Sequence, residues 1–446
     1  MEETSTVPFR SQHFAWLLLY LNLLMLFPRS GQSVTSLDPQ SAFRILMVML
    51  AGTIAILSLP GNGMAIRALV KLPLATFFFF AIIALFSSTF ASLYFYSMWK
   101  GLEILADVLV IAVIIGHQRP FASIRKTYNL TLLLIGLTAA TAWIGVLVNP
   151  GYAFVSEKGL VPFRLQGYYP RLNSNSLGSF SAISALVALM RLFNCTRRRG
   201  FYAVIAVAMA LTMILTTSRT ALIAFVFGLL NFFFFSRRKA LFFTLLGGIS
   251  LILIGGIVQE FARDWFRKGQ ADSTLESLSG RTVGWKAAWE LFKESPFWGN
   301  GFASAGRFDV LNDGASTLHG SFFEIIVGVG LVGCMLWGFS LFYTGVRIFR
   351  PQNVLVKNLP TAILHCRSEV LSLYAFLLVR GLTSSGLASH EKEFMLMLTL
   401  AAFATINLGV QEQTAENPTG IIQESMEEAD GPSDMPEPRY KYKYLE

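Results

Sequence analysis

Long blocks of apolar residues constrain this chain more than any other feature. Of its 446 residues, 54% are hydrophobic and 14% are charged, whereas soluble chains carry about 25% charged residues on average. The apolar residues gather in blocks close to the roughly 20 residues that a helix needs to cross a hydrocarbon layer about 30 Å thick. The sequence therefore predicts an all-α polytopic membrane protein.

Twelve such blocks are the predicted membrane spans. The first block could also be the core of a signal peptide, but it lacks a small-residue cleavage site, which favours a retained span. The spans cover about 13–27, 43–59, 73–90, 95–116, 130–148, 177–193, 201–217, 220–235, 240–258, 320–346, 361–379 and 394–412.

The basic residues predict how the spans are oriented. The net charge is +9, and much of the excess lies in alternate short loops, as expected of loops on the cytoplasmic side. This explanation removes the need for a nucleic acid partner. With twelve spans, both termini are then cytoplasmic. The chain divides into a membrane domain at 1–258, a long periplasmic loop at 259–319, a second membrane domain at 320–412 and a disordered cytoplasmic tail at 413–446.

Three pieces face the opposite, external side. They are the loop 149–176, the turn 216–220 and the long loop 259–319, which escapes the charge rule because of its length. Within the long loop, Trp285, Trp289 and Phe292 recur at helical spacing among charged residues. This pattern predicts an amphipathic helix near 283–294 that lies in the membrane interface.

Four arginines on the external side are candidate anion-binding residues. Arg219 lies between two apolar spans, where an arginine is costly unless it reaches water or meets an anion. Arg281 precedes the amphipathic helix, and Arg164 and Arg171 lie in the loop 149–176. Each alone is an end anchor or an ordinary loop arginine. Together they favour a pyrophosphate or a similar anion, since the guanidinium fork matches phosphate oxygens.

One histidine and one glutamate at the end of the long loop are further candidates. His319 lies where this loop enters the span 320–346, and imidazole exchanges protons near neutral pH. A lone histidine is more often structural than catalytic. Glu324 lies five residues later, where it could orient the histidine if that span begins irregularly.

Charged residues inside the span 95–116 form another candidate group. Lys100, Glu103 and Asp107 share one helical face. An internal salt bridge that fixes packing is one reading. The other is that the two acids meet the external arginines and help to bind substrate.

The sequence lacks the usual motifs of nucleotide, metal or serine-nucleophile chemistry. It contains no Gly-rich nucleotide loop, no H-E-x-x-H and no Cys-x-x-Cys. An enzyme built from the candidates above is therefore expected to need neither metal nor cofactor, with arginine charge stabilising the leaving group.

Four motifs resemble those of the bacterial O-antigen ligase and Wzy-type O-antigen polymerase superfamily, in the same order. Ser174 replaces the proline of the first motif, and Gly320 replaces the asparagine that follows the histidine in the last. The motifs are R-L-Q-G at 164–167 with N-S-N-S-L-G at 173–178, T-S-R-T at 217–220, G-R-T-V-G-W at 280–285 with P-F-W-G-N-G at 296–301, and H-G-S-F-F-E at 319–324 with G-L-V-G at 330–333.

The resemblance implies a glycosyltransferase of the bacterial inner membrane. It would move a glycan from undecaprenyl pyrophosphate to a sugar hydroxyl on the periplasmic side, with inversion and without metal. Arg219 and Arg281 would bind the pyrophosphate, and His319 would act as general base. Arg164 and Asn175 fall in the first motif, and Arg171 lies between its two parts; all three are candidate substrate-binding residues.

The acceptor stays open. It would be lipid A-core for a ligase in lipopolysaccharide biosynthesis, or a lipid-linked repeat for a polymerase, with a chain-length regulator as a further candidate partner. The substantial loop 149–176 favours an O-antigen or exopolysaccharide polymerase. The main alternative is a twelve-span transporter of polysaccharide or lipid-linked solute, supported by Glu103 and Asp107. A non-enzymatic scaffold would give no reason for the arginines to gather beside lipid.

Overall fold

The computed structural model describes most of the chain and is largely helical. The first six helices are α1 (Ser11–Asn22), α2 (Pro39–Ser58), α3 (Gly63–Leu69), α4 (Leu74–Ser87), α5 (Tyr94–Ile115) and α6 (Pro120–Val148). The described residues are 10–24, 26, 38–156, 162–194, 198–236, 238–254, 281–311, 318–350 and 361–406.

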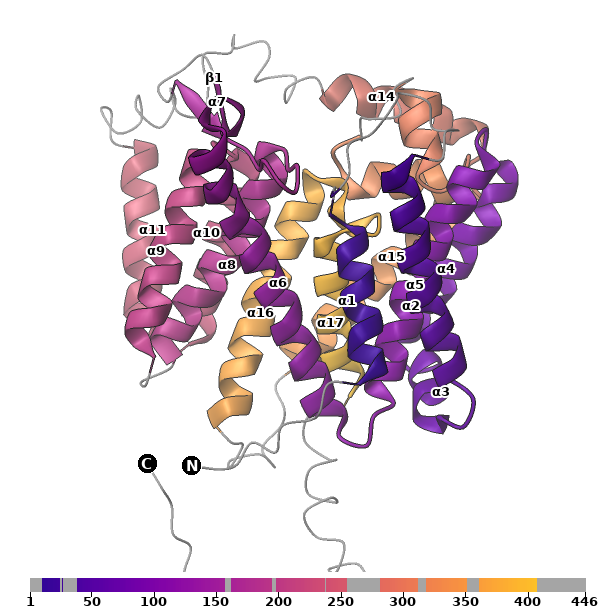
Figure 1. Cartoon of the computed structure of the whole chain (residues 1–446), viewed down its shortest axis with the longest axis horizontal. Coiled ribbons are helices and arrows are strands. Elements are labelled where there is room, and N and C mark those ends of the chain that lie inside the picture. The colour runs from indigo at the N-terminus through magenta and orange to yellow at the C-terminus, as the bar shows by residue number, and fades with distance from the viewer. Residues whose placement is uncertain are drawn as a thin grey trace, which may run out of the picture.

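The remaining elements follow the same plan, with most helices side by side along one axis (Figure 1). They are α7 (Pro150–Ala153), β1 (Phe154–Ser156), β2 (Phe163–Leu165), α8 (Ser174–Asn194), α9 (Arg199–Leu215), α10 (Arg219–Phe235), α11 (Lys239–Ile254), α14 (Arg281–Glu294), the π-helix η2 (Ala305–Val310), α15 (Ser321–Phe349), α16 (Thr361–Leu382), the 3₁₀ turn η3 (Ser385–Leu387) and α17 (Lys392–Thr405).

A described helix overlaps each predicted span, but the count of twelve spans is not established. By length and composition, α2, α6, α8 and α15 are suited to cross a membrane. The pair formed by α3 with Leu74–Phe90 also qualifies if its 73° bend lies within one broken span. The long apolar helices and the hydropathy of the chain make it a multi-pass membrane protein. The tail 413–446 and the loop residues 259–280 lie outside the described part.

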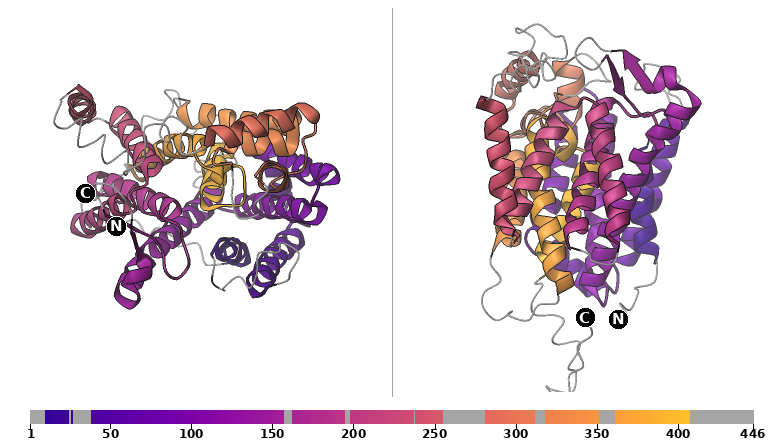
Figure 2. Two further views of the ribbon diagram at one scale, coloured as in Figure 1. Left: turned by 90° about the horizontal axis from the view of Figure 1, so that it is seen from above. Right: turned by 90° about the vertical axis from the view of Figure 1, so that its left-hand side faces the viewer.

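Large apolar side chains cover the outside of the bundle. Leu57 on α2 is 74% exposed, Leu147 on α6 is 85% exposed and Val204 on α9 is 69% exposed. Soluble proteins rarely expose contiguous apolar surface on this scale, and lipid is the solvent that suits it. By contrast, α17 is buried along its whole length and lies in the middle of the bundle when seen from above (Figure 2). The core is therefore packed around α17.

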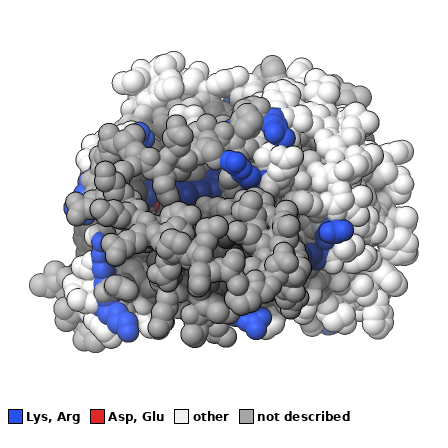
Figure 3. Space-filling model, turned by 90° about the horizontal axis from the view of Figure 1, so that it is seen from below, with Lys and Arg blue, Asp and Glu red and all other residues white. Residues whose placement is uncertain are grey.

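The two ends of the bundle differ. Helix α14, α7 and β1 lie at one end, which we call the upper end, and α3 lies at the other (Figure 1). Seen from the lower end, the described residues show several Lys and Arg side chains and very little Asp or Glu (Figure 3). Helix α14 lies across the upper end instead of running along the bundle axis (Figure 2).

The fold is mostly helical, as predicted, and a small β-hairpin is its exception among the described residues. Strands β1 and β2 pair antiparallel, with Phe154 opposite Leu165 and Val155 opposite Arg164. The rings of Phe154 and Phe163 pack edge to face, with centroids 5.0 Å apart. Aromatic and β-branched residues favour such pairing, but three-residue strands are too short for an alternating pattern to stand out in the sequence.

Helix α15 is interrupted where the glycine-rich segment 296–301 packs against it. Gly330 has a φ of 63° inside the helix. In place of helical bonds, the N–H of Leu331 donates to Pro296 O at 2.7 Å and the N–H of Gly301 donates to Gly328 O at 3.0 Å. A Cβ at Gly299 would lie 2.5 Å from the backbone of Gly328. The glycines of both motifs thus permit a backbone-to-backbone contact that larger residues would exclude.

Candidate active site

The T-S-R-T motif forms the tight turn that starts α10. Thr217 has a φ of 52°, a left-handed conformation that is uncommon outside glycine. Arg219 follows as the first residue of α10 and is half-buried. It therefore stands at a helix N-terminus, where free N–H groups and the helix dipole favour anions.

The first turn of α8 packs against this turn and explains the N-S-N-S-L-G motif. The Asn173 side chain accepts from the N–H of Ser176 at 2.7 Å and so caps α8. The hydroxyl of Ser218 donates to Asn175 Oδ1 at 3.2 Å. A Cβ at Gly178 would lie 2.6 Å from that of Ser218. Ser174 is the first residue of α8, a position that accepts either proline or serine.

Helix α14 presents Arg281 at the upper end of the bundle. Arg281 is its first residue, and Trp285 follows one helical turn later. The Trp285 ring stacks on Phe323 of α15 with centroids 4.9 Å apart, and its Nε1–H donates to Leu318 O at 2.8 Å. The tryptophan of the G-R-x-x-x-W motif therefore anchors the helix that carries the arginine.

His319 stands between two anchored residues. Its φ is 53°, and its side chain is exposed. On one side, the N–H of Leu318 donates to Glu324 Oε1 at 2.7 Å. On the other, the Ser321 hydroxyl donates to Ser384 O at 2.7 Å and accepts from the N–H of Leu387 at 3.2 Å. These contacts hold a conformation that is costly for a non-glycine residue.

Glu324 acts on the backbone before His319. From its place in the sequence, Glu324 could orient the imidazole if the span began irregularly. The bond observed is the one that its carboxylate accepts from Leu318 N–H, and this bond fixes the chain that carries His319. Glu324 is in the first turn of α15, so it also complements the positive end of that helix. A direct contact with substrate stays a prediction.

Arg281 lies close enough to both Arg219 and His319 for the charges of these side chains to interact. Burial lowers the pKa of Arg281, and the nearby charges of Arg380 and Arg219 lower it further. The pKa of His319 is also lowered, by partial burial and then by the charges of Arg281 and Arg380. An arginine with a lowered pKa still stays charged at neutral pH, whereas the histidine stays neutral there and able to accept a proton.

Arg380 is a member of this group that the sequence analysis missed. It lies in the last turn of α16 and is buried, with 5% of its surface exposed. It falls one residue beyond the predicted span 361–379, where an arginine passes for an end anchor. The only signal in the sequence was an arginine beside a polar segment, T-S-S-G-L-A-S-H-E, that returns the chain to the next span.

Arg164 and Arg171 lie in the hairpin region of the loop 149–176. Arg164 is in β2 opposite Val155, and Arg171 is exposed, with its guanidinium 5.8 Å from the centroid of the Tyr152 ring. Neither contributes to the pKa shifts of Arg281 and His319. Their role in binding substrate stays a prediction.

Glu103 and Asp107 pair with partners inside the bundle. Glu103 lies 2.7 Å from Lys100 Nζ and 3.4 Å from the guanidinium of Arg44. Asp107 Oδ2 lies 2.7 Å from His390 Nδ1. These contacts match the internal salt-bridge reading and not the expected meeting with the external arginines. Arg44 and His390 are distant in sequence from α5, so helical spacing gave no sign of them.

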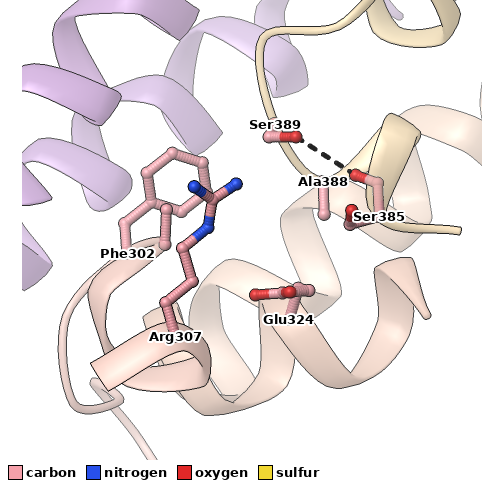
Figure 4. Close-up of a pocket in the computed structure, with 7 residues that line it drawn as sticks. Phe302, Arg307, Glu324, Ser385, Ala388 and Ser389 are labelled. Carbon is pink, nitrogen blue, oxygen red and sulfur yellow. Dashed lines mark hydrogen bonds between the residues drawn. The ribbon is translucent and has the colours of Figure 1, made fainter. Parts of the chain in front are cut away.

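A small cavity lies beside the backbone that carries His319. Phe302, Ala303, Arg307, Glu324, Ser385, Ala388 and Ser389 line it. Arg307 and Glu324 reach into it from η2 and α15, facing the serines of the segment before α17 (Figure 4). Arg307 also donates to the Tyr96 hydroxyl at 2.9 Å. The space, about 10 Å³, suits roughly one water molecule and not a sugar.

Metal ligands do not gather in the described part of the chain. No group of three or more His, Cys, Asp or Glu side chains there could hold a metal ion. The arrangement at the upper end is instead one of arginines around a neutral histidine, which can bind a polyanion beside a base.

Comparison with known proteins finds one family model that is similar to part of the chain. No curated protein sequence matches the chain. Residues 204–338 match the family model described as O-antigen ligase, and this segment contains Arg219, Arg281, Trp285, His319 and Glu324. Over this segment, the match confirms the resemblance to O-antigen ligases that the motifs indicated.

Proposed function

We propose that the protein transfers a glycan from undecaprenyl pyrophosphate to a sugar hydroxyl at the periplasmic face of the bacterial inner membrane. The observation that carries this proposal is the meeting of Arg219, Arg281 and His319 at one end of the bundle. Three separate segments supply them: the start of α10, the start of α14 and the entry to α15. The basic residues seen at the lower end (Figure 3) support a cytoplasmic location for the lower end of the bundle.

The two arginines act on the leaving group. Each offers a planar fork of N–H donors that binds two phosphate oxygens at once. As the bond between the anomeric carbon and the phosphate oxygen breaks, negative charge grows on the pyrophosphate, and the fixed cations stabilise it. Arginine charge can do this work without a metal ion.

His319 acts on the acceptor. Its lowered pKa keeps the imidazole neutral at pH 7, so it can remove the proton from the acceptor hydroxyl. The acceptor oxygen forms a bond to the anomeric carbon from the face opposite the pyrophosphate. The carbon–oxygen bond breaks, its electron pair leaves with undecaprenyl pyrophosphate, and the single displacement inverts the anomeric centre.

The choice between ligase and polymerase concerns the acceptor. The hairpin of the loop 149–176 gives the upper end a second ordered piece, on the other side of that end from α14 (Figure 1). This piece favours a polymerase or an exopolysaccharide enzyme, which must accept a second lipid-linked glycan. A chain-length regulator would then be a further partner.

The test is glycan transfer by purified protein with an undecaprenyl-pyrophosphate-linked donor. Wild type is compared with His319→Ala, Arg219→Ala and Arg281→Ala, and with Lys293→Ala as the control. Lys293 is on α14 like Arg281, but its side chain is 55% exposed and paired with Glu290. We expect transfer to fall at least 100-fold in the first three variants and to be unchanged in the control. Full activity in the first three would refute the site.

Two acceptors are offered separately in the same assay. Growth of the lipid-linked chain identifies a polymerase, and transfer to lipid A-core identifies a ligase.

A transporter is the alternative. One observation favours it: Glu103, Asp107 and His390 are fully buried inside the bundle, where ionisable groups often mark a transport path. Movement of the lipid-linked glycan across vesicle membranes without any new glycosidic bond would establish transport.

A further inference from the structure

Arg380 occupies the meeting point of four helix ends. It lies in the last turn of α16 and contacts the first turns of α8, α10 and α17. Its Nη1 donates to the hydroxyl of Thr220, and its Nη2 donates to the backbone oxygen of Asn175 at 3.3 Å. Thr220 follows Arg219 directly, and Asn175 is the residue whose side chain bonds to Ser218. One guanidinium therefore joins the two turns that form the Arg219 side of the site.

The ion pair that Arg380 makes is long and shared with a second cation. Its Nε lies 3.9 Å from Glu393 Oε1, beyond hydrogen-bond distance, and makes no hydrogen bond within the described structure. Glu393 is instead bound by the hydroxyl of Ser179 at 2.6 Å and by Lys392 Nζ at 3.0 Å. Two cations thus share the buried carboxylate of Glu393, and Glu391, the residue directly before α17, also acts on the charge of Arg380.

The charge of Arg380 reaches the candidate active site. Both Arg281 and His319 respond to the charge of Arg380, although they belong to different elements. A guanidinium that served only to pack α16 would more simply be paired one to one, as Arg191 is with Glu369 at 3.0 Å on the same helix pair.

We propose that Arg380 is a positioning residue of the pyrophosphate site. Its fork ties the first turn of α8 to that of α10 and so aims Arg219, and its charge adds a third cation to the field of Arg219 and Arg281. The assignment rests on the proposed function, because it takes pyrophosphate to be the anion.

Several charged groups surround His319, and the test must separate the effect of Arg380 from the effects of the others. Arg281 approaches from α14 and Arg380 from α16, while Arg219 approaches Arg281 from α10. Glu324 of α15 binds the backbone next to His319. Glu393 of α17 lies 3.9 Å from Arg380, and Glu391, directly before α17, also acts on Arg380. Replacing Arg380 by an uncharged residue should therefore raise the pKa of His319. Replacing it by lysine, which keeps the charge but loses the guanidinium fork, should not.

The experiment compares Arg380→Lys and Arg380→Gln with Arg191→Gln. Arg191 is a matched control because it is a largely buried arginine in an ion pair, placed towards the other end of α8. Two quantities are measured: kcat/KM for glycan transfer from the lipid-linked donor, and the pH dependence of His319 modification by diethyl pyrocarbonate, read by peptide mass spectrometry. The second measurement needs no activity.

A lysine at position 380 keeps the charge but cannot donate to both Thr220 and Asn175 as the guanidinium fork does. We expect Arg380→Lys to lower kcat/KM about tenfold and to leave the His319 midpoint in place. Arg380→Gln should lower kcat/KM further and move the midpoint up by roughly half a pH unit. Arg191→Gln should leave both unchanged in the folded fraction.

Two results would overturn the assignment. One is an unchanged His319 midpoint in Arg380→Gln; the other is an Arg380→Lys variant as active as wild type. An inactive wild type with both acceptors would instead refute the proposed function, and the histidine titration would still report whether Arg380 acts on His319.

Discussion

At the scale of single residues, unusual backbone angles gather at the candidate site. Among the described residues, the non-glycine residues with positive φ are Thr217, Ala303 and His319. Two of them belong to the motifs that supply Arg219 and the base. Such conformations cost on the order of 1–3 kcal/mol and persist where surrounding contacts over-determine them. At His319, those contacts are the bonds made by Leu318 and Ser321.

The protonation of His319 predicts how activity depends on pH. Burial and the charges of Arg281 and Arg380 lower its pKa below the usual value of about 6.5. Because only the neutral imidazole accepts a proton, activity should be level near pH 7 and should fall as the pH drops through the lowered pKa. Measurements of kcat/KM from pH 5 to 8 would check this, with His365→Ala as the control. An acid midpoint above 6.5 would contradict it.

At Gly330, in the break of α15, one added methyl group should strongly lower the stability of the protein. Gly330 has a φ of 63°, and a Cβ there would lie 2.4 Å from the backbone of Phe297. Gly330→Ala should destabilise the protein by about 2–4 kcal/mol. Gly338→Ala is the matched control, because it is in the same helix and a Cβ there meets nothing within 4 Å. The fraction of monodisperse protein left after heating in detergent measures the difference, and equal stability of the two variants would contradict the prediction.

At the scale of elements, the site depends on α14 being fastened to α15. Ala288, Leu318 and Val327 form a small core beneath α14, separate from the main core of the bundle. Helix α14 can therefore shift without unfolding the membrane part. The sequence motif that spaces Arg281 and Trp285 by four residues places both on the same face of α14.

Trp285 is the residue to change in order to loosen α14. Trp285→Phe keeps an aromatic ring on Phe323 but loses the bond to Leu318 O, which costs about 1 kcal/mol and should lower activity about fivefold. Trp285→Ala also removes the stacked ring and should cost about 3 kcal/mol of docking. Trp289→Ala is the control, because Trp289 is 43% exposed. Transfer assays beside thermal stability would check this, and equal losses from Trp285→Ala and Trp289→Ala would refute it.

The helices could be predicted from the sequence, but their partners could not. Apolar blocks marked the helices, and the motif order marked Arg219, Arg281 and His319. Arg380 and Arg44 gave no comparable signal, because each acts through residues far along the chain: Arg380 through Asn175 and Thr220, Arg44 through Glu103. Local spacing reports on one helix face, whereas these contacts depend on how several helices pack.

At the scale of the whole molecule, the lower end, the interior and the upper end of the bundle differ in their charged residues. The lower surface is rich in Lys and Arg (Figure 3), the interior holds compensated pairs such as Asp107 with His390, and the upper end concentrates cations around His319. The buried pairs have a structural consequence. Removing one partner would leave the other as an uncompensated buried charge, which is strongly destabilising, so these pairs fix how α5 packs against α2 and against the segment before α17.

The orientation of the two ends in the membrane is the prediction that links the fold to the proposed function. If the lower end is cytoplasmic, a cysteine at the α5–α6 loop is shielded from outside, and one on α14 is accessible. The test uses Gln118→Cys and Lys286→Cys, both at exposed positions, in a chain whose three native cysteines are replaced by alanine. Cells with a permeabilised outer membrane are treated with a membrane-impermeant maleimide.

We expect the reagent to label the Lys286→Cys variant in intact inner membranes and the Gln118→Cys variant only after those membranes are broken. The lipid-linked glycan can be used at the periplasmic face only if Arg219, Arg281 and His319 lie on the same side as Lys286. Labelling of the Gln118→Cys variant alone would place the arginines in the cytoplasm. The proposed glycan transfer would then have to take place before export, and the buried ionisable pairs of α5 would become the better guide to function.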